Sequence, residues 1–279
     1  MNALPYGGSG GVYRNLVKAR LANNEMVLTL RILQARSVDI LKIAKSAGFH
    51  SVLLDLQHSA MSLDTCCQMA SAALDAGLTP IVRVPAGMLT YAAVALDGGA
   101  QVLLLPGIET AEAAAEAVRT LRYPPVGERS VTSALPQTGF NKMPAAQLIR
   151  AVDAETSIQV LVESQKAVDN AAGIAAVDGI DALVTGTNDL CASLGLFGEH
   201  GHPTIREIHR KLAAICQDNG IRLIPGGIGN LSILEDYVAM GAAPSFLAGT
   251  DTDFLIEGCM KAVANFQTFG QHEPADEQA

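Results

Sequence analysis

Short apolar runs alternate with longer amphipathic segments along most of the chain. The apolar runs have the length of strands and lie at 26–32, 51–56, 79–84, 101–106, 157–163, 182–186, 221–226 and 244–249. The amphipathic segments repeat apolar residues with helical spacing and lie at 37–48, 62–77, 91–99, 111–122, 164–177, 204–220, 231–241 and 253–266. Several of them begin at Ser, Thr or Asp and many end at Gly, as capped helices do. The pattern predicts eight strands and eight helices in strict alternation.

Strict alternation of strands and helices favours a parallel sheet. Eight such units favour an α/β fold of the (β/α)8 TIM-barrel type over an open doubly wound sheet. No linker rich in Pro, Gly or Ser divides the chain, so we expect one barrel domain at 25–268. A lead-in at 1–24 precedes it, and a polar tail at 269–279 follows it. The long irregular segment 123–144 predicts a loop that covers a site or contacts another subunit, and a plain surface insertion is the alternative.

Composition and charge narrow the classes of function. A formal net charge of −9 without a basic cluster argues against a nucleic-acid partner. No apolar stretch is long enough for a membrane span, and the first residues lack the regions of a signal peptide. The 5 cysteines are odd in number and contain no CxxC pair, which is typical of reduced thiols in a cytoplasmic protein.

Polar residues stand where several of the predicted strands end. Barrel enzymes place their catalytic groups at the carboxyl ends of the strands, which meet on one rim. We therefore expect the charged groups and the histidine among these residues to converge on one site. They are Asp55, Gln57 and His58 after the second strand, Arg83 in the third, Glu163 in the fifth, and Gly186, Thr187, Asn188 and Asp189 after the sixth.

Arg83 interrupts the apolar strand IVRVP, where a charge is costly to bury unless it meets an anion. Two interpretations stay open. In one, Arg83 forms an internal salt bridge with Asp55 or Glu163. In the other, its guanidinium clamps a carboxylate or keto oxygen of a substrate.

Two pairs of side chains can carry chemistry on this rim. Glu163 and Asp189 are carboxylates from neighbouring strands, and such oxygen ligands suit Mg2+ or Mn2+. The alternative is a surface glutamate and an aspartate that caps the helix starting near Leu190. Asp55 and His58 can form a dyad in which the carboxylate orients the imidazole for proton transfer. Alternatively, Asp55 caps the next helix and His58 is satisfied in a turn.

Other chemistries are disfavoured by the sequence. No lysine lies in the core of a predicted strand, which argues against a Schiff base. GxSxG and Walker sequences are absent, and no GxGxxG follows a strand. His200 and His202 are spaced like a metal pair, but no full set of zinc ligands accompanies them.

Seven short stretches stand in order along the chain: LLDLQHS, IVRVP, ALDGGAQVLLLPGIETAEAA, LRYPPVGERS, LVES, VTGTNDLCASLG and AGTDTDFL. In order and spacing they resemble the HpcH/HpaI family of class II pyruvate aldolases, and the resemblance covers roughly residues 25–268. This family includes 4-hydroxy-2-oxoheptanedioate aldolase and 2-dehydro-3-deoxyglucarate aldolase.

The resemblance implies a role for each part of the rim. Glu163 and Asp189 are expected to bind the divalent metal, which is Mg2+, Mn2+ or Co2+. Arg83 is expected to contact the keto oxygen of pyruvate and steady the enolate. His58, with Asp55 behind it, is expected to move the proton of the 4-hydroxyl group.

The resemblance also implies roles away from these side chains. The backbone amides of Gly186, Thr187 and Asn188 are expected to hold the pyruvate carboxylate. Asp97 is expected to support the surroundings of Arg83, and Tyr123 with its loop to reach a neighbouring subunit's pocket. Family members are commonly hexamers with exchanged C-terminal helices, so we expect a homo-oligomer.

The chain departs from the family pattern at a few positions. Gln57 replaces a frequent Glu, Leu161 replaces a frequent Gln, and the Thr187-Asn188 pair replaces Pro-Ala. These changes keep the expected metal ligands but leave the aldehyde partner open.

The expected function is that of a lyase, a metal-dependent aldolase that cleaves 4-hydroxy-2-oxo acids to pyruvate and an aldehyde. The reverse reaction adds pyruvate to the aldehyde. The alternatives are a lyase of the same barrel type acting on a CoA thioester, and a non-catalytic keto-acid binding protein.

Overall fold

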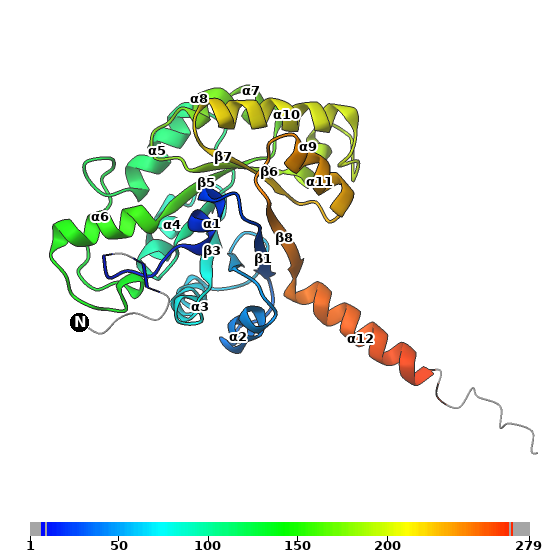
Figure 1. Cartoon of the computed structure of the whole chain (residues 1–279), viewed down its shortest axis with the longest axis horizontal. Coiled ribbons are helices and arrows are strands. Elements are labelled where there is room, and N and C mark those ends of the chain that lie inside the picture. Colours follow the sequence, from blue (N-terminus) through cyan, green and yellow to red (C-terminus); the bar gives the residue numbers. More distant parts are fainter. Residues whose placement is uncertain (1–6, 9, 268, 270–279) are drawn as a thin grey trace, which may run out of the picture.

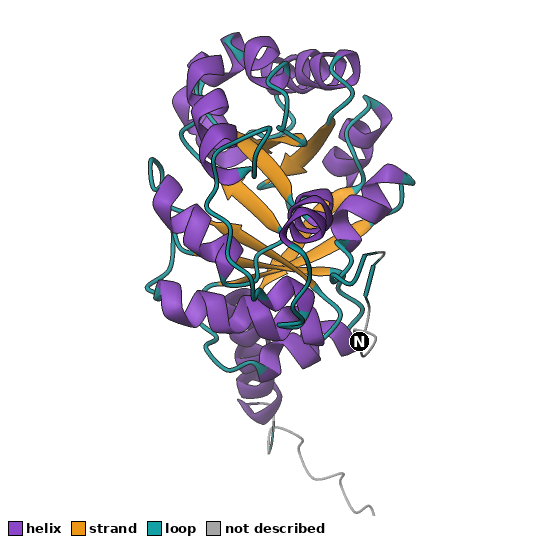
Figure 2. Cartoon of the chain, turned by 90° about the vertical axis from the view of Figure 1, so that its left-hand side faces the viewer, coloured by secondary structure: helices purple, strands orange, loops and turns teal. Residues whose placement is uncertain are grey.

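Eight parallel strands form one sheet that curves into a barrel with helices around it (Figures 1 and 2). This computed structural model describes residues 7–8, 10–267 and 269. Each predicted apolar run became a strand whose ends lie within a residue of the prediction, so the expected (β/α)8 architecture is confirmed. The strands are β1 (Val27–Ile32), β2 (Ser51–Asp55), β3 (Thr79–Arg83), β4 (Val102–Leu105), β5 (Ser157–Val162), β6 (Ala182–Gly186), β7 (Arg222–Gly226) and β8 (Ser245–Thr250).

The barrel is not sealed between β7 and β8. The sheet runs in the order β7-β6-β5-β4-β3-β2-β1-β8, and the described strands β7 and β8 form no ladder with each other. A backbone hydrogen bond from Ala243 N to Leu223 O (2.7 Å) joins them only at their amino ends. Pro225 in β7 has no N–H to donate, which suits an edge strand. The barrel is therefore nearly closed, with its gap towards the carboxyl ends of the strands.

The helices agree with the prediction in most positions. Two were not predicted: α1 and α6. The short α9 was considered as a helix starting near Leu190, and it begins at Thr187. One predicted helix, 164–177, is divided at Asn170, whose side-chain amide donates to Glu109 O (2.8 Å). The helices are α1 (Leu16–Ala22), α2 (Asp39–Ser46), α3 (Leu63–Asp75), α4 (Leu89–Asp97), α5 (Ala111–Leu121), α6 (Ala145–Glu155), α7 (Gln165–Asp169), α8 (Ala171–Ala175), α9 (Thr187–Ser193), α10 (Pro203–Asp218), α11 (Leu231–Ala239) and α12 (Asp251–Gln267).

Side chains alternate along each strand between two cores. One core lies between the sheet and the surrounding helices and takes up residues such as Val82 and Val84. The other lies inside the barrel, so Arg83, between these two valines, points inward. The inner core includes Leu53, Ile81, Leu104, Leu161, Val184 and Ile224.

The lead-in expected at 1–24 contains helix α1, which packs against the inner core. Asn15 caps this helix, because its side chain accepts a hydrogen bond from Lys18 N (2.9 Å). Val17 and Leu21 are buried with Val27 of β1. Burying each such side chain contributes about 1.5–3 kcal/mol, so α1 is part of the folded barrel and closes its amino end.

The 123–144 segment lies at the amino ends of the strands, away from the rim. Its Gln137 side chain donates to Leu96 O and Ala100 O, just before β4 begins. Tyr123 is fully buried with Val12 and Leu135 in a small core. The expectation that Tyr123 reaches a neighbouring subunit is wrong for this structure, because the chain's own residues enclose the ring.

Asp97 also differs from the expectation. It ends α4 at the amino side of the barrel and pairs with Arg129 (2.7 Å), whose guanidinium lies 4.5 Å from the centre of the Tyr123 ring. Arg83 stands at the opposite, carboxyl end of β3. Asp97 therefore fixes the 123–144 segment and does not support Arg83.

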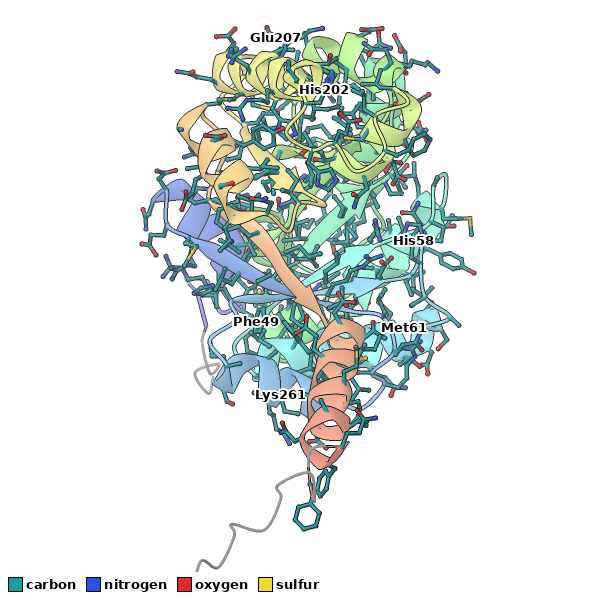
Figure 3. The ribbon with its side chains drawn as sticks, turned by 90° about the vertical axis from the view of Figure 1, so that its right-hand side faces the viewer. Phe49, His58, Met61, His202, Glu207 and Lys261 are labelled. Atoms are coloured by element: carbon teal, nitrogen blue, oxygen red, sulfur yellow. The ribbon has the colours of Figure 1, made fainter. Side chains whose placement is uncertain are left out.

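Helix α12 extends away from the barrel (Figures 1 and 3). Asp251 anchors its start, because its carboxylate accepts hydrogen bonds from the amides of Leu33, Gln34 and Ala35. The rest of the helix buries no residue. Among the described residues, no helix is long and apolar enough to cross a membrane. All five cysteines are free thiols, and of the expected tail only Phe269 is described.

Candidate active site

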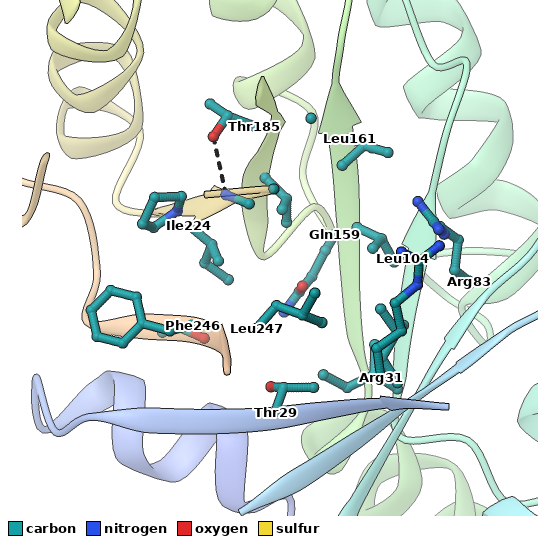
Figure 4. A pocket seen from close by; sticks show the side chains of 18 of the residues that line it. Thr29, Arg31, Arg83, Leu104, Gln159, Leu161, Thr185, Ile224, Phe246 and Leu247 are labelled. Carbon is teal, nitrogen blue, oxygen red and sulfur yellow. Dashed lines mark hydrogen bonds between the residues drawn. The ribbon is translucent and has the colours of Figure 1, made fainter. Parts of the chain in front are cut away.

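A cavity of about 310 Å³ runs through the interior of the barrel (Figure 4). At its deep end lies Val17 of α1, and around its mouth lie His58, Asn188 and Asp189. Its walls combine apolar side chains with a few polar groups, which is typical of a small-molecule site. The polar groups are Thr29, Arg31, His58, Arg83, Gln159, Thr185, Asn188, Asp189 and Ser245.

Two arginines share one buried carboxylate in this cavity. Arg83 donates from Nε to Asp55 Oδ1 (3.0 Å) and from Nη2 to Oδ2 (2.5 Å). Arg31 donates to Oδ2 from both Nε (2.8 Å) and Nη2 (2.5 Å). The internal salt bridge considered for Arg83 is therefore present, and Figure 4 shows both guanidinium groups side by side at the cavity wall.

Asp55 stays ionised at this site although it is completely buried. Burial alone raises the pKa of its carboxyl group, but the hydrogen bonds and charges of Arg83 and then Arg31 outweigh this effect. Together they bring the pKa of Asp55 to about 2. The guanidinium groups are thus held in place by a fixed negative charge.

The predicted dyad of Asp55 and His58 is not the arrangement found. Asp55 Oδ1 accepts from the backbone amides of Gln57 (3.0 Å) and His58 (3.2 Å), so the carboxylate shapes the turn after β2. Because the arginines and these amides occupy the carboxylate, it does not hold the imidazole. His58 is exposed at the cavity mouth, and its ring forms no hydrogen bond with the described residues. Gln57 follows the same turn with its Oε1 buried and unpaired among the described residues.

Glu163 and Asp189 approach each other from the ends of β5 and β6. Burial raises the pKa of Glu163, and the charge of Asp189 raises it further, whereas Arg83 and a hydrogen bond from the Gly107 amide lower it. Gly186 leaves room for this glutamate, because a Cβ there would lie 2.9 Å from Glu163 Cβ.

Two carboxylates with space for water fit the oxygen coordination of Mg2+ or a similar ion. No cluster of three or more His, Cys, Asp or Glu side chains with metal-ligand geometry occurs among the described residues. The donor set therefore fits an ion that takes its remaining ligands from water and substrate.

The turn from β6 into α9 is held rigidly at the cavity. Thr187 is buried and its hydroxyl donates to Thr185 Oγ1 (3.2 Å), which also accepts from Gly226 N (3.2 Å; Figure 4). Asn188 Oδ1 lies 2.7 Å from His200 Nε2. The first amides of α9, like those of any helix, lack acceptors within the helix.

Comparisons with known proteins identify the family of this chain. A model of the HpcH/HpaI aldolase/citrate lyase family matches residues 32–256, which is most of the chain. The chain belongs to the HpcH/HpaI aldolase/citrate lyase family.

Several named relatives match most of the chain. The 4-hydroxy-4-methyl-2-oxoglutarate aldolase tasA of Hapsidospora irregularis is 31% identical over 91% of this chain and 97% of its own length. The 4-hydroxy-2-oxo-heptane-1,7-dioate aldolase of Salmonella arizonae is 33% identical over 81% of this chain and 84% of its own. A crystal structure of an HpcH/HpaI aldolase from Desulfitobacterium hafniense superposes with a TM-score of 0.84, at 27% identity over 93% of this chain and 99% of that chain.

Within this HpcH/HpaI barrel, the structure brings together most of the rim residues that the sequence predicted. Arg83, His58, Gly186, Asn188 and Asp189 line one cavity. Asp55 and Glu163 lie directly behind this lining. Asp55 accepts hydrogen bonds from Arg83, and the charge of Asp189 raises the pKa of Glu163. Thr187 is completely buried and does not line the cavity.

Five polar residues of the cavity were missed at the sequence level: Thr29, Arg31, Gln159, Thr185 and Ser245. Arg31 interrupts the apolar strand VLTLRI just as Arg83 interrupts IVRVP, and this signal was available. Gln159 lies in the middle of β5 and is buried at the deep end of the cavity (Figure 4). Its place could be expected only once the strand was known to face the barrel interior.

Proposed function

We propose that this chain is a divalent-metal-dependent aldolase that cleaves 4-hydroxy-2-oxo acids to pyruvate and an aldehyde, and that it also catalyses the reverse addition. The observation that carries the proposal is the placement of Arg83 and of the Glu163–Asp189 pair around one cavity inside the barrel. The relatives named as aldolases of 2-oxo acids support the same activity.

Glu163 and Asp189 would hold the metal ion, which is Mg2+, Mn2+ or Co2+. The ion would act as a Lewis acid that polarises the keto group of the substrate. The residues that remain for the organic chemistry are Arg83, His58 and the turn that starts α9.

Arg83 stabilises the negative charge that appears on the keto oxygen. Its Nε and Nη2 are fixed on Asp55, so the guanidinium is oriented before the substrate arrives. A donor that is already oriented stabilises a developing oxyanion without having to reorganise.

His58 takes the proton of the C4 hydroxyl group. The C3–C4 bond then breaks, its electron pair passes to the enolate of pyruvate, and C4 leaves as the carbonyl carbon of the aldehyde. The exposed position of His58 at the cavity mouth places this proton transfer where the aldehyde can leave.

The pyruvate carboxylate binds at the start of α9. The backbone amides of Gly186, Thr187 and Asn188 are part of a turn that Thr185 and His200 hold from either side. Free amides at a helix start favour an anion.

The alternatives have less support. The alternatives are a lyase of CoA thioesters and a non-catalytic keto-acid binding protein, whereas the named relatives cited above are aldolases. The choice of aldehyde stays open, because Asn188 replaces the alanine common in the family.

The proposal includes a homo-oligomer, by resemblance a hexamer, in a cytoplasmic location and without nucleic-acid or membrane partners. Support for the oligomer comes from α12, whose exposed apolar side chains need a protein surface to cover them. These side chains are Phe254, Leu255, Ile256, Met260, Val263 and Phe266.

The test is the release of pyruvate by metal-stripped enzyme from a panel of 4-hydroxy-2-oxo acids, followed with lactate dehydrogenase. Adding back Mg2+, Mn2+ or Co2+ should restore the release, and a panel of malyl-CoA-type thioesters serves as the comparison. Cleavage of the thioesters alone, or no pyruvate with any metal, would contradict the proposal.

A further inference from the structure

Arg31 adds a second guanidinium to the cavity where one is enough to neutralise Asp55. Arg83 alone binds both carboxylate oxygens of Asp55, and two backbone amides complete Oδ1. Arg31 then binds Oδ2 as an additional donor. The cluster therefore carries two positive charges against one negative charge.

The remaining donor of Arg31 faces the cavity. Its Nη1 has no hydrogen bond with any described residue, and its side chain is 21% exposed although it lies inside the barrel. A positive charge in such a place is costly unless an anion meets it. A neutral hydrogen-bond donor would be enough to join β1 to β2, so that role alone does not account for the positive charge of Arg31.

The charges of the metal ion, the carboxylates and the arginines around the cavity show how the second positive charge affects a bound anion. A bound divalent ion would offset the charges of Glu163 and Asp189, and Asp55 offsets one arginine. The cavity then keeps one positive charge, so bound pyruvate makes the site neutral and its enolate leaves one uncompensated negative charge. Without Arg31 the cavity would be neutral, pyruvate would leave one uncompensated negative charge, and the enolate would leave two.

The position of Arg31 distinguishes two ligand groups that can carry a second negative charge: a distal carboxylate and the keto oxygen. Arg31 pairs with Leu53 in the sheet register, two residues deeper along β2 than Asp55. His58, which would act at C4, lies at the mouth of the cavity. A distal carboxylate beyond C4 would therefore point towards the mouth, whereas the keto oxygen lies near Arg83, beside Arg31.

We propose that Arg31 determines the preference of the cavity for a dianion with charge at both the carboxylate and the keto oxygen over the corresponding monoanion. This inference rests on the proposed function, because the enolate of pyruvate is such a dianion. Arg31 thus favours the charge state reached during cleavage over that of bound pyruvate.

The test compares the binding of oxalate and pyruvate to the metal-loaded enzyme by calorimetry. Oxalate resembles the enolate in shape and charge, and pyruvate is the monoanion. Arg31→Gln should weaken oxalate binding about tenfold more than pyruvate binding, because the loss of one charge affects the dianion most. Arg31→Lys keeps the charge and should preserve most of the preference for oxalate.

A matched control is Arg206→Gln, which removes an arginine that pairs with Asp236 between α10 and α11, outside the cavity. Its oxalate-to-pyruvate ratio should equal that of the wild type. Equal weakening of both ligands by Arg31→Gln would indicate a merely structural role and overturn the inference. An unchanged ratio together with a raised KM only for dicarboxylic substrates would also overturn it, in favour of a distal carboxylate.

The proposed function and this inference fail in different ways. If the wild type releases no pyruvate from any hydroxy-oxo acid, the proposed function fails. The ratio of oxalate to pyruvate binding is still measurable in that case and decides the role of Arg31 by itself.

Discussion

At the scale of single residues, the site depends on two positions, Asp55 and Gly186, that act by placing other side chains. Asp55 is fully buried and orients two arginines together with the turn that leads to His58. Gly186 has no side chain, and a Cβ at this position would collide with Glu163. Substitution of either residue should therefore change the geometry of the site.

We predict that Gly186→Ala lowers metal affinity about tenfold, because the new methyl group displaces Glu163 from its position. The measurement is calorimetric titration with Mn2+. Gly229→Ala is the control, since a Cβ at Gly229 meets nothing within 4 Å. Equal Mn2+ affinity in Gly186→Ala and the wild type would show that Glu163 does not need this space.

At the scale of elements, buried side-chain contacts between helices support the rim of the barrel. His209 of α10 stacks on Tyr237 of α11 with ring centres 3.7 Å apart, and its Nε2 lies 3.5 Å from Thr187 Oγ1. Burial lowers the pKa of His209 to about 4, so the ring is neutral at pH 7. The packing of α10 and α11 therefore supports the turn at the start of α9.

The free energy of unfolding should fall as the pH falls from about 6.5 towards 4. In this range the unfolded chain binds a proton at His209 and the folded chain does not, so protonation favours unfolding. The full contribution is roughly 3 kcal/mol. Urea unfolding at several pH values measures it, and His209→Phe should flatten this part of the profile. A wild-type profile that is already flat would show that the folded protein accepts the proton.

Strand positions were predictable because a parallel barrel buries both faces of each strand, which leaves apolar runs that are easy to recognise. The missed helix α6 had a weaker signal, since Leu148 and Val152 are its buried residues in an otherwise mixed segment. The division of the 164–177 helix depends on the contact of Asn170 with Glu109, which no local pattern records.

The candidate site was predictable to the extent that strand ends define it. The partner of Asp55 was not, because the choice between His58 and the arginines depends on side-chain directions across β1, β2 and β3. Tyr123 and Asp97 were misplaced for a similar reason. Their partners come from the N-terminal segment and from Arg129, far away in the sequence.

At the scale of the whole molecule, α12 is the part that a single chain leaves uncovered. Its apolar residues Ile256, Met260 and Val263 recur with helical spacing and are more than half exposed. We predict that Ile256→Glu with Met260→Glu converts the oligomer into smaller species in sedimentation velocity. Lys261→Glu, on the same helix, is the control. A wild type that sediments as a monomer would contradict the proposed oligomer.

The central claim is that this cavity stabilises the enolate of pyruvate with the help of Arg83. The most direct measurement is the exchange of the methyl protons of pyruvate with D2O, followed by NMR, because it requires no knowledge of the aldehyde. The wild-type enzyme with Mg2+ or Co2+ should catalyse exchange, and metal-stripped enzyme and Arg83→Ala should not. Exchange at the wild-type rate in Arg83→Ala, or none in the metal-loaded wild type, would contradict the claim.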